Sequence, residues 1–206
     1  MAERGRPRAF DRDLALKQAT EVFWSKGYDN TSVADLTRVM GINSPSLYAA
    51  FGSKEALFRE AVQLYGRTES PEIWQAIANA PTAREAVAGF LHATADAFTK
   101  PGKPAGCLVV LGALHASDTN AGVCQALRSM RAENVTTLRE RLDRAVAEGE
   151  LPSGLDSASV AVFYVTVQQG MSIQARDGAT REMLHAIADG ALAAWDKLVS
   201  TGQTKP

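Results

Sequence analysis

Two short helical patterns separated by Gly41 occupy residues 31–58. Hydroxyl groups at Thr31 and Ser32 can cap the first helix, and Gly41 permits a tight turn before the second. Apolar side chains recur at three- and four-residue spacing, at Val33, Leu36, Val39, Met40, Leu47 and Phe51. Two helices joined at a steep angle by a glycine turn, with apolar residues on the inner side, form a helix-turn-helix. The segment therefore predicts a small helical head.

Helical patterns also dominate the rest of the chain, and alternating strand patterns are nearly absent. We predict an all-α protein with an N-terminal three-helix helix-turn-helix head and a C-terminal helical ligand-binding and dimerisation body. The predicted boundary divides the chain into residues 1–66 and 67–206, with the fourth helix bridging them. The predicted helices cover residues 11–26, 31–40, a short stretch from 43 or 44, 53–66, 71–80, 82–100, 106–117, 121–149, 157–176 and 180–200.

Composition limits the classes of function. The chain has 206 residues, of which 46% are hydrophobic and 22% charged, and a formal net charge of -1. Any nucleic-acid binding must therefore use a local basic surface. Cys107 and Cys124 show no metal-binding spacing, and no apolar stretch resembles a signal peptide or membrane span. We expect a reduced cytoplasmic protein without metal, cofactor or membrane partner.

The outer side of the second short helix carries small and polar side chains. Asn43, Ser44, Ser46 and Tyr48 lie opposite the inward-facing residues, next to two alanines. Side chains of this size allow a helix to enter the major groove of DNA, where base edges present distinct donors and acceptors. The pattern indicates a recognition helix.

Residues 27–58 resemble the N-terminal signature of the TetR family of bacterial transcriptional regulators. The resemblance extends over residues 11–66, whereas the body agrees with the family only in helical layout and length. The matching positions are Gly27-Tyr28, Thr31-Ser32-Val33, Asp35-Leu36, Gly41, Leu47-Tyr48, Phe51 and Lys54-Glu55-Ala56-Leu57-Phe58.

The resemblance implies specific DNA contacts. Thr31 and Ser32 would hold a phosphate through hydroxyl and backbone N–H groups, and Tyr48 and Lys54 would each contact a phosphate. The first turn of the recognition helix would face bases or phosphates through Asn43, Ser44, Pro45 and Ser46. The chain departs from the family at Ser44-Pro45, where a basic and a small residue are common, and at Ala49-Ala50, where bulkier polar residues are common. These departures leave few side chains able to read bases.

A basic segment precedes the first helix. Arg4, Arg6 and Arg8 alternate with glycine and proline, which suits a flexible arm in a narrow minor groove. The alternative is a disordered terminus that only aids solubility.

The last two predicted helices carry more apolar surface than one chain can cover. The helix over residues 157–176 is apolar nearly all round, and the helix over 180–200 has an apolar stripe. Pairing both helices with their copies in a four-helix bundle would cover these faces. The resemblance implies the same homodimer, which would present two recognition helices to double-stranded operator DNA.

The other body helices are predicted to enclose a pocket for a small apolar or aromatic effector. For each candidate residue, the alternative is that its side chain packs in the hydrophobic core and contacts no ligand. The candidate lining residues are Trp74, Phe90, Phe98, Cys107, Leu111, His115, Met130, Tyr164, Gln168 and Met171.

The function expected from the resemblance is a repressor released from its operator by this ligand. An activator, or a regulator without ligand control, would have the same sequence features. An enzyme is the less favoured alternative, because the chain shows no nucleophile–base set and we expect no catalytic residues. A helical partner-binding protein would explain the terminal helices but not the head.

Overall fold

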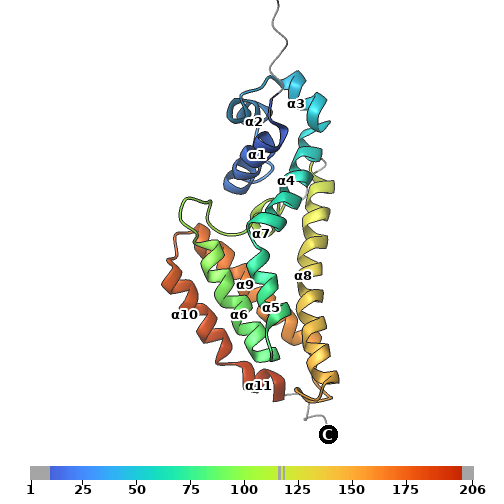
Figure 1. Cartoon of the computed structure of the whole chain (residues 1–206), viewed down its shortest axis with the longest axis vertical. Helices are drawn as coiled ribbons and strands as arrows, with labels where there is room; N and C mark the ends of the chain where they lie inside the picture. Colours follow the sequence, from blue (N-terminus) through green and yellow to red (C-terminus); the bar gives the residue numbers. More distant parts are fainter. Residues whose placement is uncertain (1–9, 116, 118, 201–206) are drawn as a thin grey trace, which may run out of the picture.

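The computed structural model describes residues 10–115, 117 and 119–200, and over these ranges the chain is helical without strands (Figure 1). The head contains α1 (Arg12–Lys26), α2 (Val33–Met40) and α3 (Ser44–Phe51). The helices that follow are α4 (Lys54–Thr68), α5 (Pro71–Asn79), α6 (Ala83–Phe98), α7 (Leu108–Leu111), α8 (Ala121–Ala147), α9 (Ser157–Arg176), α10 (Arg181–Leu192) and α11 (Trp195–Ser200). The all-α architecture predicted from the sequence is confirmed.

Side-chain caps define the starts of the head helices. The side chains of Asp11, Ser32 and Asn43 each accept a hydrogen bond from a backbone amide in the first turn of the helix that follows. Gly41 ends α2 in the left-handed conformation, with φ +64°, so the chain turns sharply into α3. These local signals fix the angle between α2 and α3.

An aromatic cluster holds the head helices on α4. The ring of Phe23 from α1 meets the ring of Phe58 from α4 edge-on, with centroids 5.0 Å apart, and Tyr28 contacts Phe58 at 5.2 Å. Leu47 from α3 is fully buried in the same hydrophobic core. Close edge-to-face contacts add to the gain from apolar burial. The recognition helix is thus supported by a rigid core.

Helix α4 runs from the head into the body (Figure 1). It extends to Thr68, slightly beyond the predicted end, and Pro71 starts α5 two residues after the Glu69 cap. Gly66 therefore lies inside a continuous helix. The division at residues 66 and 67 stays a prediction.

The body packs α5, α6 and α10 on one side and α8 and α9 on the other (Figure 1). Helix α6 contacts α5, α9 and α10, and α8 lies against α9. Phe90, Leu91 and Tyr164 are among the fully buried side chains of this core. The other predicted body helices are confirmed to within a few residues of their ends.

The predicted helix over residues 106–117 is wrong in extent, because only Leu108–Leu111 is helical among the residues of this range that the structure describes. The carbonyl of Gly112 accepts a hydrogen bond of 2.8 Å from the amide of Tyr28 in the head. A Cβ at Gly27 would lie 3.1 Å from the same oxygen, so the two backbones approach closely. This hydrogen bond joins the segment directly after α7 to the head.

The predicted helix over residues 180–200 is two helices. The chain tightens at Ala193 and Ala194, where the Ala194 amide donates to the Ala191 carbonyl three residues earlier. This turn places Trp195 in the core, 6.1 Å from the ring of Tyr164 between centroids. Burial of a large aromatic side chain favours the break over a continuous helix.

Among the described helices, none is both long and apolar enough to cross a membrane. Arg4, Arg6 and Arg8, the predicted minor-groove arm, lie outside the described residues.

Candidate DNA interface and its junction with the body

The first turn of α3 is polar and exposed. Asn43 caps it by accepting the Ser46 amide at 2.9 Å, which leaves the NH₂ group of Asn43 facing solvent. Ser44 and Pro45 are exposed, and Ser46 is half-buried. The structure thus brings these four predicted residues together at one helix end.

Tyr48 continues the exposed surface along α3. Its side chain is 47% exposed, whereas Leu47 next to it is fully buried. Ala49 is also exposed and adds no polar group. The outer face of α3 therefore offers one phenol, small side chains and a polar first turn, and no Lys or Arg.

The N-terminus of α2 carries a closed capping box. The Ser32 hydroxyl accepts the Asp35 amide at 3.0 Å and donates to the Asp35 carboxylate at 2.8 Å, and the Ser32 amide donates to the same carboxylate. Lys26 and Arg38 form ion pairs with Asp35. The hydrogen bonds from Ser32, with those from Lys26, lower the pKa of Asp35 to about 2.

This box changes how a phosphate would approach α2. The Ser32 hydroxyl is exposed but already bonded, and the Asp35 carboxylate beside it repels an anion. Lys26 and Arg38, which flank the carboxylate, are the positive groups at this helix. Sequence reasoning did not single out either residue: Lys26 reaches Asp35 only when α1 and α2 pack together, whereas Arg38 lies three residues from Asp35 within α2.

Thr31 does not occupy the predicted phosphate position. Its side chain is fully buried, its hydroxyl donates to the Gly27 carbonyl at 2.6 Å, and its amide donates to the Tyr28 carbonyl at 3.2 Å. Both donors proposed for a phosphate are therefore used to close the turn between α1 and α2. The assignment of Thr31 as a DNA contact is corrected to a structural role.

Lys54 opens α4 and lies over the ring of Tyr28, with its Nζ 4.2 Å from the ring centroid. Partial burial lowers the pKa of Lys54, and nearby Asp29 opposes that shift. The side chain stays half-exposed. The aromatic ring holds the ammonium in place without removing it from the surface.

Arg12 is a structural residue that the sequence pattern did not reveal. Its Nη2 lies 2.8 Å from both carboxylate oxygens of Glu60 in α4, and the guanidinium lies over the ring of Phe51 at 4.4 Å. Its Nη2 also donates to the carbonyl of Ala50 at the end of α3. No local signal could link residues 48 positions apart.

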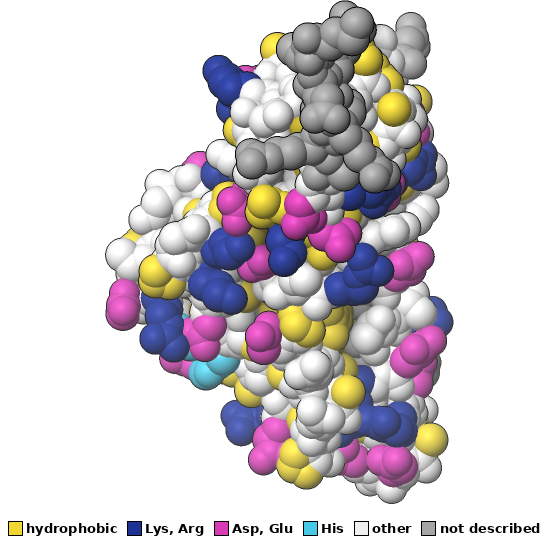
Figure 2. Space-filling view, turned by 45° about the horizontal axis from the view of Figure 1, so that its top comes forward, with side chains coloured by type: hydrophobic (Ala, Val, Ile, Leu, Met, Phe, Trp, Pro, Cys, Tyr) yellow, Lys and Arg dark blue, Asp and Glu magenta, His cyan; other side chains and the backbone are white. Residues whose placement is uncertain are grey.

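On the face that Figure 2 shows, Lys and Arg side chains are interspersed with Asp and Glu. The positive groups do not form one continuous patch on this face.

Backbone carbonyls at the end of α1 join the head to the body. The guanidinium of Arg176, at the end of α9, donates to the carbonyls of Ser25 and Trp24 at 2.6 and 2.8 Å and to Ala105 at 3.0 Å. The Trp24 indole donates to the Gly106 carbonyl at 2.9 Å. These hydrogen bonds therefore connect α1 of the head to α9 of the body and to the loop before α7.

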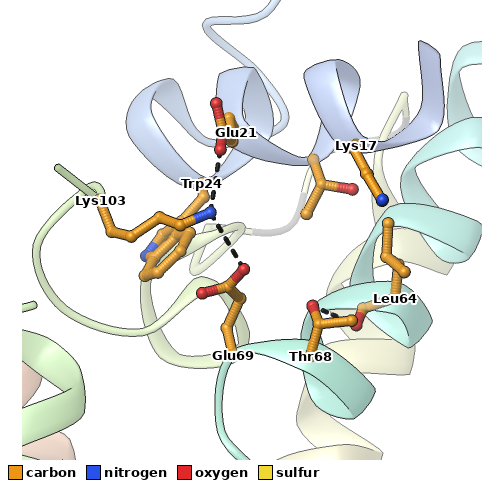
Figure 3. A pocket seen from close by; sticks show the side chains of 8 residues that line it. Lys17, Glu21, Trp24, Leu64, Thr68, Glu69 and Lys103 are labelled. Carbon is orange, nitrogen blue, oxygen red and sulfur yellow. Dashed lines mark hydrogen bonds and ion pairs between the residues drawn. The ribbon is translucent and has the colours of Figure 1, made fainter. Parts of the chain in front are cut away.

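Lys103 adds an ion-pair link at the same junction. Its Nζ lies 3.0 Å from Glu21 of α1 and 3.1 Å from Glu69 at the end of α4 (Figure 3). Hydrogen bonds to both carboxylates raise the pKa of Lys103. The three side chains border an open pocket of about 310 Å³ together with Trp24 and Leu64.

The residues predicted to contact the effector lie in different parts of the structure. Phe90, Phe98, Tyr164 and Met171 are buried in the main core, and Leu111 packs on that core from α7. These positions agree with ordinary core packing as well as with a pocket wall.

The remaining candidate effector residues do not line one common pocket. Trp74 and Met130 line two different open pockets, the first between α5 and α8 and the second between α4 and α8. His115 is exposed before α8, which disagrees with a place in an enclosed pocket. Gln168 is buried in α9, and its Oε1 has no hydrogen-bond partner among the described residues.

The two cysteines are free and buried. Burial raises the pKa of the Cys107 thiol, although hydrogen bonds from Tyr65 and from the amides of Val110 and Val109 oppose the shift. A buried thiol with a raised pKa is a poor nucleophile.

Two family models match the chain. Residues 15–61 match the bacterial regulatory proteins of the tetR family, and residues 83–188 match the tetracyclin repressor-like C-terminal domain. The second match alone covers half of the chain. The chain belongs to the TetR family of transcriptional regulators. It carries the family's helix-turn-helix, and a family of regulatory proteins supports the expectation that it is not an enzyme.

Curated TetR-type relatives match over nearly the whole length. The chain is 38% identical over 197 residues to the HTH-type transcriptional repressor ComR of Escherichia coli K12, covering 95% of this chain and 94% of ComR. It is 34% identical to the repressor BdcR of the same organism, covering 89% and 88%.

A solved TetR-family structure is also similar. The chain shares 47% identity and a TM-score of 0.88 with a cysteine-substituted variant of the regulator CifR, covering 93% of this chain and 100% of that one. In that structure the CifR variant is complexed with 26-bp double-strand operator DNA.

Proposed function

We propose that this TetR-family regulator is a homodimeric repressor that binds operator DNA and is released from it by a small molecule. The observation that carries the proposal is the exposed face of α3, from Asn43 to Tyr48, on a rigid helix-turn-helix. The names of the similar repressors and the operator complex of CifR support it. In this proposal residues 1–66 bind DNA and residues 67–206 dimerise and bind the effector.

Phosphate contacts supply most of the affinity in this proposal. Tyr48, Lys54 and the cations Lys26 and Arg38 beside α2 face the phosphate backbone, and the first turn of α3 faces the bases. Because α3 offers few bidentate groups, DNA shape contributes to operator choice.

An apolar surface on α9 and α10 supports the dimer. Val162, Phe163 and Ile173 of α9 and Met183 and Ile187 of α10 are all at least 36% exposed. A Cβ placed at Gly170 or Gly190 would meet no atom within 4 Å, so other helices can approach both sites closely. Exposed apolar side chains on adjacent helices mark an interface.

The junction supports coupling between effector and DNA. Arg176 and the loop before α7 bond to the end of α1, so a shift of α9 relative to α8 would reach the head. A small ligand that favours the shifted arrangement would change the spacing of the two recognition helices.

A gel-shift titration with the DNA upstream of the protein's own gene tests the proposal. We expect sequence-selective binding that weakens steeply with salt, by a dimer. Binding no tighter than to unrelated DNA of equal length would contradict it.

A further inference from the structure

An open pocket of about 190 Å³ lies at the end of the body remote from the head, between α5 and α8. Helix α5 contributes an apolar wall with Trp74, Ile77 and Ala78. Helix α8 contributes one stripe at helical spacing, namely Thr137, Glu140, Arg141 and Arg144. The pocket thus combines an aromatic wall with two guanidinium groups.

Arg141 is buried at this pocket and has fewer hydrogen-bond partners than its guanidinium has donors. Its side chain is 4% exposed, and its Nε and Nη1 have no hydrogen-bond partner among the described residues. Its Nη2 lies 3.5 Å from the carbonyls of Ala80 and Pro81, at the limit of a hydrogen bond. The nearest carboxylate oxygen, on Glu150, is 3.7 Å away.

Glu150 does not neutralise Arg141 fully. Its other oxygen accepts a short hydrogen bond from the amide of Ala83 at the start of α6, which fixes the carboxylate there. Unpaired donors in a protein interior are costly, and a buried guanidinium normally makes charge-assisted bonds. Arg141 therefore has the capacity for an anionic acceptor that the chain itself does not supply.

We propose that this pocket binds a small organic monoanion, a carboxylate on an apolar or aromatic group. The guanidinium of Arg141 turns into the pocket and holds the carboxylate with two parallel bonds, a geometry that lysine cannot provide. The apolar part lies against Trp74 and Ile77, and Arg144, one turn along α8, adds a second positive charge. Glu140 at the rim disfavours multivalent anions such as phosphate.

If this pocket is the effector site, the effector is an organic carboxylate, and this part of the inference rests on the proposed function. Turning Arg141 releases Ala80 and Pro81, the link between α5 and α6, and Glu150, the link after α8. Binding would therefore loosen contacts among three body helices at once.

Titration of the full-length protein with benzoate, without DNA, tests the site by calorimetry. Benzamide serves as the neutral probe of the same shape, and inorganic phosphate as the multivalent anion. We expect saturable benzoate binding, with benzamide and phosphate each at least about tenfold weaker, the factor expected for one charge-assisted hydrogen bond. Equal binding of benzoate and benzamide, or no binding up to the solubility limit of benzoate, would overturn the proposal.

Variants separate a binding role from a structural one. Arg141→Met keeps the apolar stem of the side chain without its charge and should abolish the preference for benzoate over benzamide. Arg141→Lys keeps the charge and should retain only weak binding, which covers the case that the methionine variant fails to fold. Arg139→Met, an exposed change on the same helix, should bind benzoate like the original protein. If Arg141→Lys binds benzoate unchanged, Arg141 is not the anion's partner.

Operator binding without benzoate is measured in parallel by gel shift. Absence of selective operator binding would refute the proposed repressor, whatever the benzoate result. Loss of the benzoate preference alone would refute only the anion site.

Discussion

Asp35 shows how one side chain serves both stability and charge at the DNA-binding surface. Its pKa is lowered from 3.8 to about 2 by the Ser32 hydrogen bonds and Lys26. A carboxylate with a lowered pKa in the folded state stabilises the fold above its unfolded pKa, and this stabilisation is lost as pH falls. We therefore expect Asp35→Asn to lower the melting temperature at pH 7, and the difference from the original protein to shrink between pH 4 and pH 2.

Thermal unfolding followed by circular dichroism over this pH range checks the Asp35 prediction. A difference between Asp35→Asn and the original protein that does not change with pH would show that the carboxylate charge plays no part.

Tyr48 is expected to bind a phosphate through its phenol. Tyr48→Phe removes the hydroxyl from a side chain that is 47% exposed, so stability should not change. Operator affinity should fall about tenfold, the effect of one hydrogen bond to a charged group. The loss should be equal for related operator sequences, because a phosphate contact reads no base. Fluorescence anisotropy measures it, and a change of base preference would instead place the phenol at a base edge.

At the scale of elements, the junction depends on Arg176 at the end of α9. Its three bonds reach two carbonyls of α1 and one of the loop before α7. Arg176→Met keeps the unbranched apolar stem of the side chain but removes all donors, and we expect the free energy of unfolding to fall by about 2 kcal/mol. Urea denaturation measures this, with Arg139→Met as the exposed control. If both variants unfold alike, these bonds do not hold the head to the body.

Local patterns determined most elements but not their interruptions. The caps at Ser32 and Asn43 and the turn at Gly41 are short-range signals, and the head follows the prediction closely. The short α7 and the break before Trp195 depend on contacts with residues far along the chain. The amide of Tyr28 donates to the carbonyl of Gly112, and the ring of Tyr164 packs against the indole of Trp195. The spacing of apolar residues in a short stretch of sequence reflects only neighbouring residues, so it cannot predict contacts between residues far apart in the chain.

At the scale of the whole molecule, the residues predicted to bind DNA lie closer together in the structure than the residues predicted to bind the effector. The polar face of α3 is encoded within eight residues, so it could be read directly. Thr31 was misassigned because its hydroxyl looks like any cap until the turn closes on Gly27. The candidate anion site at Arg141 was not predicted, because the lack of partners for a guanidinium is visible only once helices are placed.

The proposed dimer belongs to the scale of the whole molecule, and its expected interface is the apolar surface of α9 and α10. Ile187 lies in this surface and is 36% exposed, so a charged residue there is tolerated in the monomer but is buried in a dimer. We expect the original protein to sediment at twice the chain mass of 22.0 kDa, and Ile187→Glu to sediment as a monomer. Leu114→Glu, also at an exposed apolar residue but outside α9 and α10, should remain dimeric. Because two linked heads gain affinity by binding adjacent half-sites together, Ile187→Glu should also lose operator binding. A dimeric Ile187→Glu with full operator affinity would place the interface elsewhere.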